Sequence, residues 1–324
     1  MRLSAGESEK LVTNRMQNLV YILSVVLPLL IALGLGFFTR KKKILFPEAI
    51  EGMKTFVVKF ALPAMLFGLF FTAEFESSLL VFSGATFVLG YLGLGFGILV
   101  AKPFIKRSPM LQYMNVGWEV GLMGYALFAL LFGAENLRYM ALMDFGQVLF
   151  VFSGFFTLLY ARNGQGLKES FKSLLKNPIP WSMLLGVACA ASGVSKALEP
   201  SGVTSLIVSV CNFISAPLSC LIFIVVGYGI EFSKKNIGTA LISAILRTFV
   251  CSILCLVSLF VVGKFIVLSE AMRWAVIMFY LTPAPYVLTI FALNDQERAD
   301  ISMSLTMQTI VSISAFILIV LFRG

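Results

Sequence analysis

Long apolar segments repeat along the whole chain and are separated by short polar stretches. Each is close to the length of about twenty residues at which an apolar helix crosses a bilayer. There are ten such segments, approximately 18–38, 53–72, 78–101, 110–133, 138–161, 179–195, 204–229, 237–262, 272–293 and 300–322. The pattern therefore predicts an all-α membrane protein with ten transmembrane helices.

Composition supports this prediction and excludes several functions. Of 324 residues, 59% are hydrophobic and 13% are charged, and the mean hydropathy is +0.95, which excludes a cytosolic enzyme or a disordered chain. The chain has no histidine, which excludes His-based metal sites and Ser-His-Asp triads. Its five cysteines all lie in apolar segments and form no CxxC pair, so we expect them to pack between helices.

Charge predicts the orientation in the membrane. The loops after the first, third, fifth, seventh and ninth segments hold fourteen Lys and Arg residues, against eight on the opposite side. Cytoplasmic loops collect these residues, so we predict a plasma (inner) membrane protein with both termini external. The formal charge of +9 has the same explanation, and no nucleic-acid partner is expected because no basic domain lies outside the membrane.

The longest connection, 162–178, divides the chain into two halves. It separates 18–161 from 179–322 and follows an odd number of crossings. We predict that this connection is a cytoplasmic loop and that residues 1–17 form an external tail. Five crossings in each half would invert the second half relative to the first. We therefore predict two inverted five-helix repeats.

Weak internal symmetry supports the repeats. The second segment of each half carries a proline in a similar apolar setting, Pro63 and Pro217, and we predict that both act as hinges. The fourth segment of each half is the most interrupted: 110–133 has glycines on both sides of Glu119, and 272–293 has two prolines. Interrupted helices at matching positions of inverted halves are typical of a transporter's binding site.

The interrupted segments supply candidate binding residues. Pro283 and Pro285 each remove a backbone donor and disfavour helix at the preceding residue, so the helix should break there. Gly121 and Gly124 would let the chain unwind and expose backbone groups to a ligand, or would only pack closely against a neighbouring helix. Tyr286 supplies a nearby hydroxyl.

The sequence resembles the auxin efflux carrier family of bacterial and plant transporters. The stretch 41–67, KKKILFPEAIEGMKTFVVKFALPAMLF, is similar to the start of that family. Further similar motifs follow in order and spacing over nearly the whole chain: Leu131-Phe132-Gly133, Lys176-Asn177-Pro178, Ala216-Pro217-Leu218 and Gly227-Tyr228-Gly229.

The resemblance implies a fold and an activity. The fold would be similar to that of bile-acid sodium symporters, with the broken fourth and ninth helices crossing near the midplane and a scaffold domain beside a moving transport domain. The activity would be carriage of small organic anions such as malonate, malate or auxin-like carboxylates. Some members are homodimers, so a homodimer is an expectation of the resemblance.

One departure from the family bears on substrate. Many members have a pattern like Asn-x-Gly-x-x-Gly-x-Pro in the fourth helix, whereas this chain has Glu119 at the asparagine position and Ala126 at the proline. A carboxylate there would repel an anion unless it is protonated or has captured a cation. The substrate of the plant carriers therefore cannot simply be assigned to this chain.

Glu119 is the first candidate for chemistry. A charged, unpaired carboxylate inside a membrane is costly. It could be a proton or Na⁺ site coupled to substrate, or a structural acid bound by the backbone of the broken helix. Asn115, one turn earlier on the same face, could donate to a carboxylate substrate or to a neighbouring helix. Beyond a coupling proton or Na⁺, no cofactor or metal is expected.

Two further charged residues lie within apolar segments. Arg247 could neutralise Glu119 or Asp144, or attract an anionic substrate. Asp144 appears near a membrane edge, which leaves a solvated or capping role beside a coupling role.

The lead hypothesis is a secondary transporter of small organic anions that works by alternating access. The alternative within transport is a carrier of a neutral or cationic solute with Glu119 as its counter-charge. A solute sensor that does not transport would usually carry a signalling domain, and none is evident. No nucleotide-binding loop is present, and an intramembrane enzyme lacks a histidine base or a paired-aspartate motif.

Overall fold

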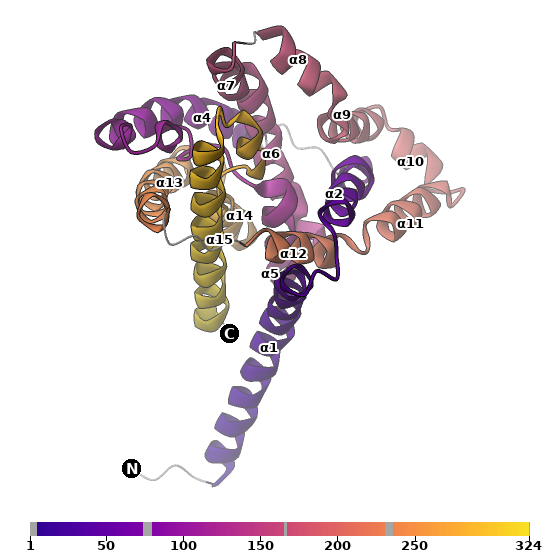
Figure 1. Ribbon diagram of the computed structural model, residues 1–324. Helices are drawn as coiled ribbons and strands as arrows, with labels where there is room; N and C mark the ends of the chain where they lie inside the picture. The colour runs from indigo at the N-terminus through magenta and orange to yellow at the C-terminus, as the bar shows by residue number, and fades with distance from the viewer. Residues whose placement is uncertain (1–4, 74–79, 165–166, 231–235, 324) are drawn as a thin grey trace.

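The computed structural model describes residues 5–73, 80–164, 167–230 and 236–323, and every regular element within them is a helix or helical turn (Figure 1). Eight segments are long and apolar enough to cross a membrane, and two shorter apolar helices cover Val120–Phe132 and Pro178–Ala191. An all-α membrane protein is therefore supported, while ten crossings and two inverted repeats stay predictions.

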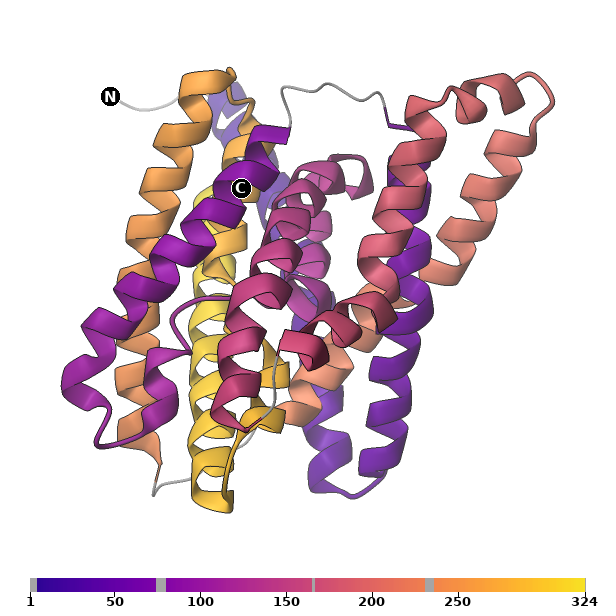
Figure 2. The same cartoon turned by 90° about the horizontal axis from the view of Figure 1, so that it is seen from above.

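The helices form two groups that lie side by side (Figure 2). One group, which we call the lateral group, consists of α1 (Ala5–Lys41), α2 (Pro47–Phe56), α3 (Leu62–Phe71), α9 (Pro178–Ala191), α10 (Val194–Leu198), α11 (Val203–Ser215) and α12 (Leu218–Gly229). Helices α3, α9, α10 and α11 lie on the right in Figure 2. Helix α1 packs along α12, and α3 packs against α9 and α11.

Small residues bring α1 and α12 into direct backbone contact. A side-chain carbon added at Gly36 would overlap the carbonyl oxygen of Ile224, and one added at Gly227 would overlap that of Leu33. Such close approach is a common way for membrane helices to associate, because lipid gives no hydrophobic driving force between them.

The other group, which we call the central group, holds most of the buried aromatic residues. It consists of α4 (Leu80–Ala101), α5 (Tyr125–Phe132), α6 (Leu137–Phe150), α7 (Phe156–Arg162), α13 (Ile237–Phe265), α14 (Glu270–Leu281) and α15 (Asp295–Arg323), with short turns between them. Helix α4 packs against α6 and α13, and α13 packs against α15.

Two segments differ from the sequence prediction. The connection 162–178, predicted to be a loop, contains helix α8 (Leu167–Lys176). Its polar and apolar residues alternate with a helical period, which the prediction overlooked because the segment is too polar to cross a membrane. Helix α1 already begins at Ala5 and so includes much of the predicted tail 1–17.

The predicted hinge prolines both lie at irregular points of the lateral group. Pro63 follows a π-helical turn, η1 (Val57–Ala61), and Pro217 separates α11 from α12. Their similar positions fit the predicted symmetry, and movement about them stays a prediction.

Candidate functional site

Both of the predicted interruptions are breaks in helical structure. In the first, a short turn η4 (Pro109–Gln112) gives way to non-helical backbone that ends at Glu119, and the π-helical turn η5 (Val120–Gly124) then leads into α5. In the second, α14 ends at Leu281 and the turn η8 (Tyr286–Phe291) begins after an extended stretch.

The local sequence explains each break. Gly117 has a φ of +72°, a conformation that favours glycine, and a Cβ there would also press on the ring of Pro285. In the second break, Pro283 and Pro285 cannot donate backbone hydrogen bonds, and the residues before them, Thr282 and Ala284, leave the helical conformation.

The two breaks meet at Glu119, and we call this meeting point the crossover. The backbone N–H of Glu119 donates to the carbonyl of Pro283 over 2.8 Å. One carboxylate oxygen accepts from the backbone N–H of Tyr286 at 2.7 Å, and the other accepts from that of Leu122 at 3.1 Å. A single side chain therefore binds donors from both broken helices.

Arg247, on α13, binds the crossover through carbonyl groups. Its side chain is buried and donates to the carbonyls of Met114 (3.0 Å), Gly117 (2.8 Å) and Thr282 (2.8 and 3.2 Å). In the described part of the chain, all of its hydrogen bonds go to these carbonyls. The direct pairing with Glu119 or Asp144 that we considered is therefore not what the structure contains.

Two buried glutamines complete the crossover. Gln147, on α6, accepts from the backbone N–H of Trp118 and donates to the carbonyl of the same residue, both at 2.8 Å. Gln308, on α15, accepts from the backbone N–H of Ala284 at 2.9 Å and donates to the Ser243 hydroxyl, also at 2.9 Å. Each break is thus held by a glutamine from the long helix that follows it.

Asp144 connects to the first break through Gln147. Its carboxylate accepts from the Gln147 amide at 3.1 Å and from the Tyr125 hydroxyl at 2.9 Å. Only 5% of Asp144 is exposed, so the solvated role considered for it is wrong.

Asn115 is buried and faces helix α4 rather than a solute. Its amide nitrogen donates to the carbonyls of Gly97 (3.3 Å) and Leu111 (2.9 Å). Of the two roles considered, the structure contains the hydrogen bond to a neighbouring helix.

The predicted glycines occupy tight positions beside these groups. Gly121 lies against Leu62 of α3 and against the Glu119 carboxylate, and Gly124 packs between Val120 and Thr282. Gly121 therefore belongs to the surface where the crossover meets the lateral group.

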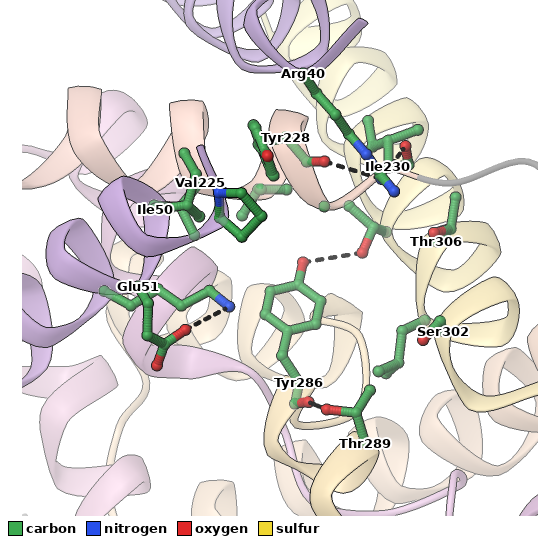
Figure 3. Close-up of a pocket in the computed structure, with 16 residues that line it drawn as sticks. Arg40, Ile50, Glu51, Val225, Tyr228, Ile230, Tyr286, Thr289, Ser302 and Thr306 are labelled. Carbon is green, nitrogen blue, oxygen red and sulfur yellow. Dashed lines mark hydrogen bonds and ion pairs between the residues drawn. The ribbon is translucent and has the colours of Figure 1, made fainter. Parts of the chain in front are cut away.

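A cavity of about 490 Å³ lies between the two groups and reaches the crossover at Tyr286 (Figure 3). Its polar and charged side chains are Arg40, Glu51, Lys54, Tyr228, Tyr286, Thr289, Ser302, Thr306 and Thr309. Tyr286 links the two sites, because its backbone N–H binds Glu119 while its hydroxyl lies 2.9 Å from that of Thr309.

The charges of the cavity come from the lateral group. Arg40 donates to the carbonyls of Tyr228 and Ile230 at the end of α12, at 3.1 and 3.2 Å. Lys54 pairs with Glu51 at 3.3 Å (Figure 3). Arg40 and Lys54 thus bring two cationic side chains to the described wall of the cavity.

Sequence reasoning located the crossover better than the cavity. It selected Glu119, Pro283, Tyr286 and Arg247, which the structure brings together. It missed Gln308, although an amide within an apolar segment was a usable signal. Arg40 and Lys54 had no such signal, because Arg40 lies in a polar connection and Lys54 lies at the edge of the predicted segment 53–72.

No metal-binding cluster is evident among the described residues, where no three His, Cys, Asp or Glu side chains gather.

Among known proteins, a family model described as "Membrane transport protein" matches residues 21–320. No individual curated protein matches the chain.

Proposed function

Because the chain belongs to the auxin efflux carrier family of membrane transporters, which are not enzymes, we propose that it is a secondary transporter of small organic anions. The cargo class would be malonate-, malate- or auxin-like carboxylates, and the mechanism alternating access. The observation that carries this proposal is the cavity between the two helix groups, which combines cationic and hydroxyl side chains with a direct connection to the crossover.

The chemistry of the cavity suits a carboxylate. Arg40 and Lys54 supply cationic donors, and Glu51, the acid among the described lining residues, is paired with Lys54. The hydroxyls of Thr289, Ser302 and Thr306 offer neutral donors on the opposite wall. A cationic cleft with low-dielectric walls concentrates anions.

The position of the cavity suits alternating access. Its charged wall is formed by α1, α2 and α12, and its hydroxyl wall by η8 and α15 of the central group. A displacement of one group against the other would carry the crossover past the charged wall, which is the movement expected of inverted-repeat transporters. The cavity adjoins the ends of α1 and α12, and the charge pattern predicts that the connections that follow these ends are cytoplasmic.

Coupling to a proton or Na⁺ at Glu119 is part of the proposal. The Glu119 side chain is half-buried at the surface facing α3, where an ion could reach it. A proton or cation on this carboxylate would compete with the backbone N–H groups that it now binds and so change how the two breaks are joined. A homodimer and external termini stay predictions.

A neutral or cationic cargo with Glu119 as its counter-charge is the second candidate. Each Glu119 oxygen already accepts a backbone N–H, which makes the carboxylate a weaker counter-charge than a free one. This geometry favours the anion proposal over the second candidate.

The proposal is tested by uptake into proteoliposomes. Labelled malonate, malate and indole-3-acetate would be compared with a neutral amino acid and an organic cation. For a transported carboxylate, Arg40→Gln together with Lys54→Gln should raise KM about tenfold, which corresponds to about 1.4 kcal/mol of binding. Lys59→Gln is the matched control, because Lys59 is exposed outside the cavity. Uptake of only neutral or cationic solutes would overturn the proposal.

A further inference from the structure

Helix α8 carries a lysine stripe beside an exposed apolar edge. Lys168, Lys172 and Lys176 are spaced four residues apart and so follow one face of the helix. Phe171 and Leu175 lie next to this stripe and are 59% and 48% exposed. An amphipathic helix of this kind typically lies in the plane of the membrane interface, with its apolar edge in the acyl-chain boundary.

Two hydrogen bonds hold α8 beside α7 and the start of α9. The hydroxyls of Tyr160 (α7) and Ser173 (α8) lie 3.0 Å apart, and the indole N–H of Trp181 donates to the carbonyl of Leu175 over 3.1 Å. Trp181 is half-exposed at the start of α9, and exposed tryptophans of membrane proteins concentrate at the interface. The side of α8 that faces α7 is therefore occupied, and the lysines and Phe171 point away from it.

We propose that α8 binds the headgroups of anionic phospholipids in the leaflet that it borders. Helix α8 carries three lysines and one acid, Glu169, so its net charge is positive and complementary to a negatively charged surface. The predicted cytoplasmic position of 162–178 places it on the leaflet that carries anionic lipids. Phe171 and Leu175 enter the acyl-chain boundary beside the bound headgroups.

The position of α8 gives this binding a consequence for the whole molecule. The helix joins α7 of the central group to α9 of the lateral group (Figure 1). Headgroups bound along it fix one connection between the two groups and so bias their relative position. This inference goes beyond the proposed transport function and does not depend on which solute is carried.

The experiment measures thermal stability in nanodiscs in which phosphatidylglycerol progressively replaces phosphatidylcholine. A lipid that binds the native state raises its melting temperature, and we expect about 3 °C for the wild type. The combined variant K168Q, K172Q and K176Q should lose most of this shift. The matched control is K41Q, K42Q and K43Q, which removes the same charge from another predicted cytoplasmic cluster and should keep the shift.

Two further measurements separate the explanations. The combined variant K168R, K172R and K176R should respond like the wild type, which shows that charge rather than folding is responsible. Inorganic phosphate added to phosphatidylcholine nanodiscs should have no such effect. The proposal is overturned if the glutamine variant of α8 keeps the full shift, if the control loses as much, or if free phosphate reproduces it.

Discussion

The two breaks of the crossover differ in their balance of backbone N–H donors and carbonyl acceptors. The first, around Gly117, keeps its backbone N–H groups, and those of Trp118, Glu119 and Leu122 all form hydrogen bonds. The second has lost two donors to Pro283 and Pro285, so its carbonyls outnumber its donors.

The two charged side chains of the crossover bind opposite kinds of backbone group. The carboxylate of Glu119 binds N–H groups, and the guanidinium of Arg247 binds carbonyls, among them that of Thr282 at the second break. Broken helices inside a membrane leave backbone groups that must be satisfied by protein, because lipid cannot do so. The comparison teaches that each charge joins the two breaks, because Glu119 binds N–H groups and Arg247 binds carbonyls from both of them.

The largest expected effect comes from removing the carbonyl-binding charge. Arg247→Met would leave the carbonyls of Gly117 and Thr282 without their donor, and that of Met114 with only the longer bond from Gln308 (3.4 Å). We expect a loss of about 3 kcal/mol in the free energy of unfolding, since each unsatisfied buried group costs about 1–3 kcal/mol. Thermal unfolding in detergent measures it. A loss below about 0.5 kcal/mol would show that the carbonyls find other partners.

The next largest loss in the free energy of unfolding should distinguish the two glutamines. Gln147→Glu removes the donor to Trp118 and places a second carboxylate beside Asp144, so we expect a loss of about 2 kcal/mol. Gln308→Glu still accepts from Ala284, and the Ser243 hydroxyl can turn to donate to it, so its loss should stay below about 1 kcal/mol. Equal losses in the two variants would contradict the asymmetry between the breaks.

The last effect, at Glu119, is small in stability and is read in transport. Glu119→Gln keeps one acceptor oxygen and loses the other, which should cost about 1 kcal/mol and leave the fold intact. If Glu119 is the coupling site, uptake of the transported carboxylate by this variant should no longer vary with pH or Na⁺. The measurement is uptake across a pH series with and without Na⁺, and an unchanged dependence would refute the coupling role.

The sequence predicted the breaks because their causes are local. Paired prolines and a cluster of glycines disturb a helix wherever they occur, so their positions can be found without a structure. The partners of Arg247 could not be found in this way. Opposite charges suggested Glu119 or Asp144, whereas the carbonyls that it binds become available only once two distant segments have unwound.

The cavity and α8 show two other limits of prediction from the sequence. Arg40 and Lys54 face one cavity because α1 and α2 pack against α12, which lies far away in the sequence. Helix α8 did carry a local signal in its lysine spacing, and a search limited to apolar segments passed over it.

The close contact at Gly36 has a consequence for the cavity. Arg40 lies one turn beyond Gly36 on the same face of α1, and its guanidinium is held by the end of α12. Because the side chain of Gly36 is a single hydrogen atom, α1 lies close enough to α12 for Arg40 to reach the carbonyls at its end. A methyl group at this position would act as a spacer between α1 and α12 and withdraw Arg40 from those carbonyls, although it adds no charge.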